Sequence, residues 1–345
     1  MPKIPSQLSY LIGSLPFTNP RDALALLREF PPSIYSLPQL PRRSFKEAMI
    51  PQSSEGFPGI SVDEAGKKIV VNKGDGLLTE MASFYESIVA GSSKPFAISQ
   101  EYAMGYDLAL QNLKGEKSLQ FIKTQVTGPF TFGLGLNDNE GKAVWFDEQY
   151  RDIVLKGIPA KANWFVEQLS QFAEQVVISL DEPILSALGT PAYLGIKDED
   201  VINGLNEVID AVRAQGAWVA VHCCGNMDWG LLARTNLDIM SFDAYFYGEK
   251  VALYPDEIQQ FLTRGGVLAW GIVPTSDQEI IAKINIESLT ERVAELLKLF
   301  SNKGIPEDLL KVQMILTPSC GMGNLSVEEA RTAASLLFEL SNKEI

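Results

Sequence analysis

Short, almost continuously apolar runs alternate along the chain with longer segments in which apolar residues recur at roughly helical spacing. Runs of the first kind are typical of buried β-strands, and segments of the second kind are typical of amphipathic helices. The strand-like runs are 8–14, 33–38, 95–99, 119–128, 175–183, 217–224, 237–243, 267–273 and 311–321. The helical segments are 22–30, 78–91, 148–173, 199–216, 286–304 and 326–341.

This alternation predicts a parallel sheet covered by helices, and about eight repeats of it predict a (β/α)8 TIM barrel. More strand-like runs are present than a barrel can hold, so at least one of them lies elsewhere. The alternative is an open, doubly wound sheet, but no G-x-G-x-x-G follows the first strand, which disfavours a dinucleotide-binding form. Residues 41–80 are polar and rich in glycine, so we expect an insertion with a small hairpin there and one barrel domain over 1–345.

Composition narrows the range of partners. The 345 residues include 43 acidic and 29 basic ones, and the net charge of −14 disfavours binding to nucleic acid or to an anionic membrane surface. No apolar stretch is long enough for a transmembrane helix, and the first residues lack the pattern of a signal peptide. Three cysteines, two of them adjacent, do not form a disulfide framework. We therefore expect a cytoplasmic protein with free thiols.

Polar side chains stand where several of the predicted strands end. Because the carboxyl ends of parallel barrel strands open on one face, residues far apart in the sequence should meet there. Many of these residues are also ordinary turn formers, but histidine and cysteine are not. The residues concerned are Ser14, Thr127, Asp181, Glu182, His222, Cys224, Asp243 and Cys320.

The segment VAVHCCGN holds the only histidine of the chain and two of its three cysteines. His222 and Cys224 are two residues apart on a strand and therefore point to the same side, whereas Cys223 points to the other side and should pack as a small apolar residue. With Cys320 they offer the nitrogen and sulfur ligands of a zinc site, and Asp243 offers an oxygen. The alternative is a core histidine beside buried thiols.

Six motifs, in order, resemble the catalytic carboxyl-terminal half of cobalamin-independent methionine synthase, within the uroporphyrinogen decarboxylase-like barrel superfamily. The motifs are IGSLPFTNP (12–20), KTQVTGPFTF (123–132), ISLDEPILSALG (178–189), VHCCGN (221–226), DIMSFD (238–243) and TPSCGMG (317–323). Each motif is weak alone, but their common order over most of the chain is specific. The resemblance implies a short, single-barrel form of this family.

The resemblance also implies roles for individual residues. Zinc would be held by His222, Cys224 and Cys320, with Asp243 at the position of the family's glutamate ligand; the aspartate is one methylene shorter, so Glu249 is the alternative. Ser14 would hold the carboxylate of homocysteine and Asp181 its amino group. A second carboxylate for the amino group is expected in the early insertion or third strand, with Glu55 as the first candidate and Glu101 as the second. Ser319 replaces an aspartate of the family.

The implied reaction is methyl transfer to the thiol of homocysteine, giving methionine. A thiol is mostly protonated at neutral pH, and zinc can displace that proton and hold the reactive thiolate. The folate-using synthases of this family are about twice as long and carry a second barrel. The short, acidic chain therefore predicts a different methyl donor, methylcobalamin carried on a corrinoid protein.

Three other functions remain open on the sequence alone. A methylcorrinoid:coenzyme M methyltransferase would share the barrel and the zinc ligands, but its thiol has no α-ammonium group for Asp181. A porphyrinogen decarboxylase would need no metal and would use basic residues for the substrate's carboxylates. In a non-catalytic barrel, the zinc would serve stability alone. A cysteine-like or glutathione-like thiol is a further possible acceptor.

Overall fold

The computed structural model describes residues 8–193 and 195–343. Its main sheet has eight strands, all in parallel pairs, in the order β1-β11-β10-β9-β8-β7-β5-β2. These strands are β1 (Leu8–Ser9), β2 (Tyr35–Ser36), β5 (Leu119–Thr127), β7 (Ala173–Asp181), β8 (Trp218–Cys223), β9 (Ile239–Phe242), β10 (Val267–Val273) and β11 (Met314–Pro318).

The first and last strands of this order also meet, which closes the sheet. The Ile34 N–H donates to the Ser9 carbonyl at 2.9 Å, and Ser14 and Gln39 form a parallel bridge further along. The predicted (β/α)8 barrel is thus confirmed, and the open doubly wound sheet is wrong.

Eight of the nine strand-like runs contain the barrel strands, and the run 95–99 is the one that does not. Lys94–Phe96 forms a short 3-10 helix instead. Pro95 has no N–H to donate to a ladder, and the apolar signal came from Phe96, which is fully buried in the core outside the sheet.

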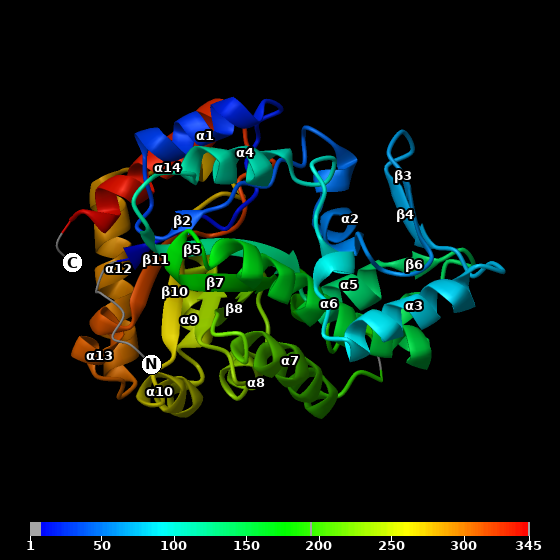
Figure 1. Ribbon diagram of the computed structural model, residues 1–345. Coiled ribbons are helices and arrows are strands. Elements are labelled where there is room, and N and C mark those ends of the chain that lie inside the picture. Colours follow the sequence, from blue (N-terminus) through cyan, green and yellow to red (C-terminus); the bar gives the residue numbers. More distant parts are fainter. Residues whose placement is uncertain (1–7, 194, 344–345) are drawn as a thin grey trace.

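Helices separate the strands and pack on the outside of the barrel (Figure 1). In α7 (Asp198–Arg213), apolar residues spaced three or four apart are buried, and the helix is followed by Gly216 at a φ of 86°. The other long helices are α1 (Pro20–Glu29), α3 (Leu77–Val89), α4 (Met104–Leu113), α6 (Glu148–Leu169), α9 (Ala244–Val251), α10 (Pro255–Thr263), α12 (Ile286–Asn302) and α14 (Val327–Ser341). Shorter helices are α5 (Pro129–Gly135), α8 (Trp229–Ala233), α11 (Gln278–Ile281), α13 (Glu307–Val312), η3 (Val144–Phe146), η4 (Pro183–Ala187) and η5 (Pro191–Tyr193).

Segment 41–80, between β2 and β5, contributes no strand to the barrel sheet. It contains η1 (Phe45–Glu47), α2 (Met49–Ser54) and the hairpin of β3 (Ile60–Asp63) and β4 (Lys68–Val71). Strand β4 also pairs with β6 (Asn137–Asp138), which follows β5 and α5 in the chain. The small sheet therefore lies beyond the carboxyl end of β5, to one side of the barrel in Figure 1.

Side chains inside the barrel change in character from one end of the strands to the other. Near the amino ends, inward-facing residues form one apolar cluster that includes Phe121, Val177, Trp218 and Ile239. Gln125, Asp181, His222 and Asp243 each lie four residues further along, in the same strand or directly after it, and therefore on the same face. The polar residues thus gather at the carboxyl end, where barrel enzymes carry their active sites.

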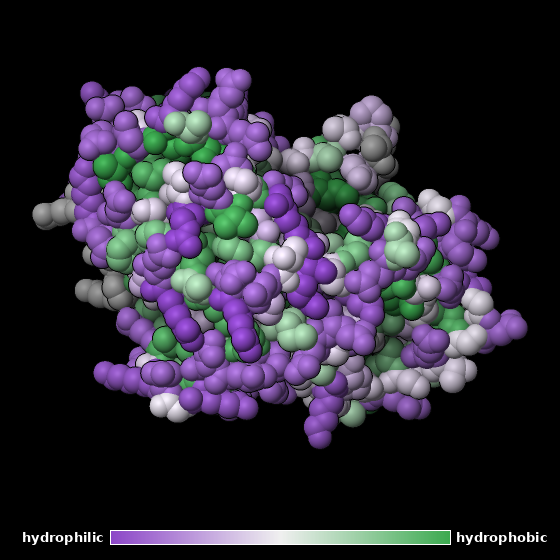
Figure 2. Space-filling view, turned by 90° about the horizontal axis from the view of Figure 1, so that it is seen from above, coloured by the Kyte–Doolittle hydropathy of each residue, from purple (hydrophilic) through white to green (hydrophobic). Residues whose placement is uncertain are grey.

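The helices of the described residues are all too short or too polar to cross a lipid bilayer. Hydrophilic residues cover most of the face shown in Figure 2, and hydrophobic residues show between them in smaller groups.

Candidate metal centre

His222, Cys224 and Cys320 come together at the carboxyl end of the barrel. Each offers one ligand atom, and the three atoms all lie within 4.8 Å of one another. His222 is in β8, Cys224 follows that strand directly, and Cys320 lies just past the end of β11. Strands β9 and β10 separate β8 from β11 in the sheet, so only the curvature of the barrel brings these residues together.

The imidazole of His222 is held in one orientation. Its Nδ1 lies 2.9 Å from the hydroxyl of Ser241, its neighbour across the β8–β9 pair. Its Nε2 is buried and has no hydrogen-bond partner within the described part of the chain. When Nδ1 donates to Ser241, Nε2 carries the lone pair that a metal ion requires. A buried ring nitrogen facing two thiols without a protein partner fits a metal ligand.

The two thiols of the cluster act on each other. The neighbouring Cys320 thiol and then the His222 imidazole lower the pKa of Cys224, against the effect of burial. Conversely, Cys224 and burial raise the pKa of Cys320, because a second thiolate would lie beside the first. A divalent cation between them would allow both thiols to ionise, and the nitrogen and sulfur donors are those that zinc prefers.

The adjacent Cys223 lies in a different environment. It is fully buried among the apolar residues between the sheet and the helices, as the alternation of strand side chains predicts. Burial raises the pKa of its thiol to about 12, so this sulfur stays protonated and unreactive.

The loop that carries Cys320 is fixed by a pair of hydroxyl groups. The Cys320 N–H donates to Thr275 Oγ1 at 3.1 Å, and the Thr275 N–H donates to Ser319 Oγ at 3.1 Å. The two hydroxyl oxygens lie 3.2 Å apart. Sequence reasoning did not identify Thr275, although its place just after β10 was a signal that could have found it.

Asp243 lies near the cluster but outside the group of three ligands. Its Oδ1 accepts the N–H of Phe246 at 2.9 Å and so caps helix α9. Burial, together with the charge of Cys224, raises its pKa to about 7, which shows that its carboxyl group is in electrostatic range of the cluster. The alternative, Glu249, is 51% exposed and forms an ion pair with Arg292 at 2.7 Å, so it faces away from the barrel interior.

Ser14 lies against the loop that carries Cys320. Its carbonyl accepts the Met322 N–H at 2.9 Å, and a Cβ added to Gly321 would lie only 2.0 Å from its Oγ. The absence of a side chain at Gly321 therefore makes room for the Ser14 hydroxyl next to Cys320.

Asp181 stands beside His222 in the β7–β8 register and is buried. Its Oδ1 accepts a hydrogen bond from Ser179 Oγ at 2.9 Å. Burial raises its pKa, and the charges of Lys123 and His222 oppose that rise. Asp181 in turn contributes to the raised pKa of Cys320, so this carboxyl group belongs to the same site electrostatically.

The structure does not bring Glu55 or Glu101 to the cluster. Glu55 Oε2 accepts the Ser99 N–H at 2.7 Å, and its charge acts on Tyr102 and Lys161, none of which belongs to the site. Glu101 is 72% exposed at its side chain and pairs with Lys46. The expectation of a second carboxylate from the insertion is therefore not met by the contacts of either residue.

Glu182, next to Asp181, has a structural contact of its own. Its carboxylate accepts the N–H groups of Phe130 and Thr131, at 2.8 and 2.7 Å, and the Thr131 hydroxyl. It therefore caps helix α5, where the helix begins after Gly128. Its full burial raises its pKa to about 7.

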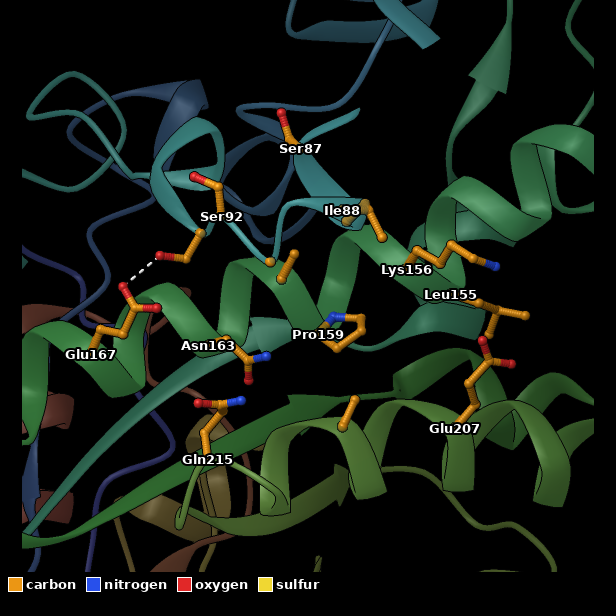
Figure 3. A pocket seen from close by; sticks show the side chains of 14 residues that line it. Ser87, Ile88, Ser92, Leu155, Lys156, Pro159, Asn163, Glu167, Glu207 and Gln215 are labelled. Atoms are coloured by element: carbon orange, nitrogen blue, oxygen red, sulfur yellow. Dashed lines mark hydrogen bonds between the residues drawn. The ribbon is translucent and has the colours of Figure 1, made fainter. Parts of the chain in front are cut away.

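A separate groove of about 310 Å³ lies on the outer side of the helix layer, between α3, α6 and α7 (Figure 3). Pro159 and Asn163 of α6 form part of its lining, and Ser93 Oγ donates to Glu167 Oε2 across it at 2.5 Å. None of the candidate site residues contributes to this groove. The candidate metal centre is therefore identified by the convergence of possible ligand atoms and not by the volume of a surface groove.

Comparison with known proteins extends the description of the fold. No family model and no curated protein matches the chain. Among solved structures, a B12-independent methionine synthase from Shewanella sp. W3-18-1, in complex with selenomethionine, matches 93% of this chain and 85% of its own, with a TM-score of 0.56 and 14% identity. A GH20 catalytic module of the pneumococcal exo-β-D-N-acetylglucosaminidase StrH matches 97% of the chain with a TM-score of 0.47 and 10% identity. At 14% identity, the similarity to the Shewanella synthase shows a shared barrel fold over most of both chains.

Proposed function

We propose that the protein is a zinc-dependent methyltransferase that methylates the thiol of homocysteine to give methionine. The observation that carries this proposal is the convergence of His222, Cys224 and Cys320 at the mouth of a barrel, with Asp181 and Ser14 beside them. The similar fold of the Shewanella methionine synthase supports the same assignment.

The ligands suit a site that prepares a thiol for attack. Zinc bound there would lower the pKa of a substrate thiol and hold its thiolate at neutral pH. Cys224 and Cys320 would supply two negative charges and soft sulfur donors, which keep electron density on the attacking sulfur. Ser241 would hold the His222 ring in the orientation that presents Nε2.

The neighbouring residues position the rest of an amino acid. Asp181 would accept a hydrogen bond from the substrate's α-ammonium group. The Ser14 hydroxyl would donate a hydrogen bond to the substrate's carboxylate. Holding both groups fixes the side chain of the substrate and therefore the place of its sulfur. The thiol proton would leave to solvent when the substrate thiol ionises. The thiolate sulfur would then form a bond to the methyl carbon with its own electron pair, while the bond between methyl group and donor breaks and its electron pair stays with the donor.

For the methyl donor, we propose methylcobalamin on a corrinoid protein. The acidic chain, with 43 acidic and 29 basic residues, is poorly suited to a polyanionic folate tail. Chain length does not distinguish the two donors, because a B12-independent synthase, the Shewanella protein, is matched by this chain over 85% of its own length. The identity of the methyl donor must therefore be tested separately from the identity of the thiol acceptor.

The test is methionine formation from homocysteine by zinc-loaded protein, with methylcobalamin or 5-methyltetrahydrofolate supplied in parallel. Methionine with methylcobalamin supports the whole proposal, and methionine with folate alone rejects the donor but keeps the acceptor. Transfer to coenzyme M but not to homocysteine would reject the acceptor. Decarboxylation of a porphyrinogen by metal-free protein would reject the zinc chemistry altogether.

A further inference from the structure

Gln125 faces the interior of the barrel at the level of the candidate site. It lies on β5 opposite Ser179, whose hydroxyl donates to Asp181, and the residue as a whole is only 7% exposed. A long amide side chain in this position has both a donor end and an acceptor end to satisfy.

Lys123, two residues earlier on the same face, determines which end of the amide points where. Its Nζ donates to Gln125 Oε1 at 3.2 Å and also to the Ile12 carbonyl, and it lies 5.4 Å from the centre of the Tyr10 ring. Because an ammonium group can only donate, Oε1 must face Lys123 and Nε2 must face away from it. Lys123 is fully buried and cannot itself contact a ligand at the mouth.

The amide of Gln125 lies against the backbone of Gly13. This glycine has a φ of 141°, and a Cβ there would lie 2.4 Å from Gln125 Cδ, 2.4 Å from Oε1 and 2.6 Å from Nε2. Only glycine leaves room for this close approach. The whole amide group of Gln125, Nε2 included, is thus placed beside the backbone that leads into Ser14.

Gln125 Oε1 accepts a hydrogen bond from Lys123, and within the described residues no hydrogen bond from Gln125 Nε2 to a protein group is found. An amide donor with a fixed orientation and without a protein acceptor, next to a free serine hydroxyl, suits an anionic oxygen of a ligand.

We propose that Gln125 Nε2 donates to the α-carboxylate of the thiol substrate, together with Ser14, and that Lys123 is the positioning residue that orients this amide. The proposal deepens the function proposed above and rests on it. It assigns to Gln125 the selection of amino-acid thiols over thiols that lack a carboxylate.

The experiment compares two ligands by calorimetric titration of zinc-loaded protein: homocysteine and 3-aminopropane-1-thiol, which is homocysteine without its carboxylate. For Gln125→Met, which keeps length and shape, we expect homocysteine to bind about ten-fold to a hundred-fold more weakly and 3-aminopropane-1-thiol to bind unchanged. Gln125→Glu should weaken homocysteine further, because it places a carboxylate against a carboxylate. Gln171→Met, at an exposed glutamine beyond α6, is the matched control.

The outcomes separate this proposal from the one on which it rests. Equal weakening of both ligands by Gln125→Met would show a structural role and overturn the inference, as would unchanged binding of homocysteine. If the wild-type protein binds neither thiol, the proposed function fails and the inference fails with it. For Lys123→Met, the account predicts loss of the same selectivity, with little further loss when it is combined with Gln125→Met.

Discussion

The two ends of the barrel interior are built from the same strands but have opposite chemistry. At the amino ends, side chains such as Phe121, Trp218 and Ile239 fill the interior with apolar contacts. At the carboxyl ends, four residues further on, the same faces carry a buried amide, a histidine and a carboxyl group: Gln125, His222 and Asp243. The first end can supply stability through burial, whereas the second buries polar groups at a cost. Buried polar groups that cost stability in this way are typical of a binding or catalytic site.

The largest expected effect comes from removing a sulfur ligand. Cys224→Ser or Cys320→Ser should abolish stoichiometric zinc binding and methyl transfer, because one of three converging ligands is lost. Zinc content by atomic absorption, with the melting temperature measured beside it, checks this. Cys223→Ala is the matched control, since its sulfur faces the helices, and it should keep full zinc. Zinc loss in the control but not in the ligand variants would contradict the assignment.

The next effect concerns the opposite end of the interior. Trp218→Ala should lower the free energy of unfolding by about 3–5 kcal/mol, because a large, buried aromatic side chain is removed from the apolar cluster. Zinc affinity of the folded protein should stay the same. Chemical denaturation of zinc-free protein and chelator competition measure the two quantities separately. A large change in zinc affinity without a change in stability would mean that the two ends are not distinct in role.

A smaller effect is expected for the carboxyl group beside His222. Asp181→Asn should weaken homocysteine binding by about 1.5–3 kcal/mol, because a charge-assisted contact with the ammonium group is lost. Binding of 4-mercaptobutanoate, which has no ammonium group, should change little. Calorimetry with both ligands checks this, and equal losses for the two would assign Asp181 to the metal site instead.

The smallest expected effect comes from the residue that holds the imidazole of His222, the proposed zinc ligand. Ser241→Ala removes the partner of His222 Nδ1 and should lower zinc affinity by about ten-fold. Ser179→Ala is the comparison variant, because its hydroxyl contacts Asp181 and not the imidazole. Competition with a zinc chelator measures both variants, and an unchanged affinity in Ser241→Ala would show that the ring is held in place without this contact.

The sequence predicted the barrel because its strands are buried on both faces and therefore read as apolar runs. It also predicted that His222, Cys224 and Cys320 would converge, since parallel strands open on one face. It could not place Glu55, because the path of the insertion depends on long-range packing that no local pattern encodes. Thr275 and Gln125 escaped notice for another reason: threonine and glutamine are common residues, and only their contacts with Ser319 and Lys123 distinguish them.

The central claim is that two distant segments of the chain share one zinc ion through their sulfur atoms. Zinc-edge X-ray absorption of the purified protein tests it directly. The account predicts about one zinc per chain, with two sulfur ligands at about 2.3 Å and nitrogen or oxygen ligands at about 2.0–2.1 Å. A stoichiometric zinc without sulfur ligands, or protein that binds no zinc when the metal is supplied, would contradict it.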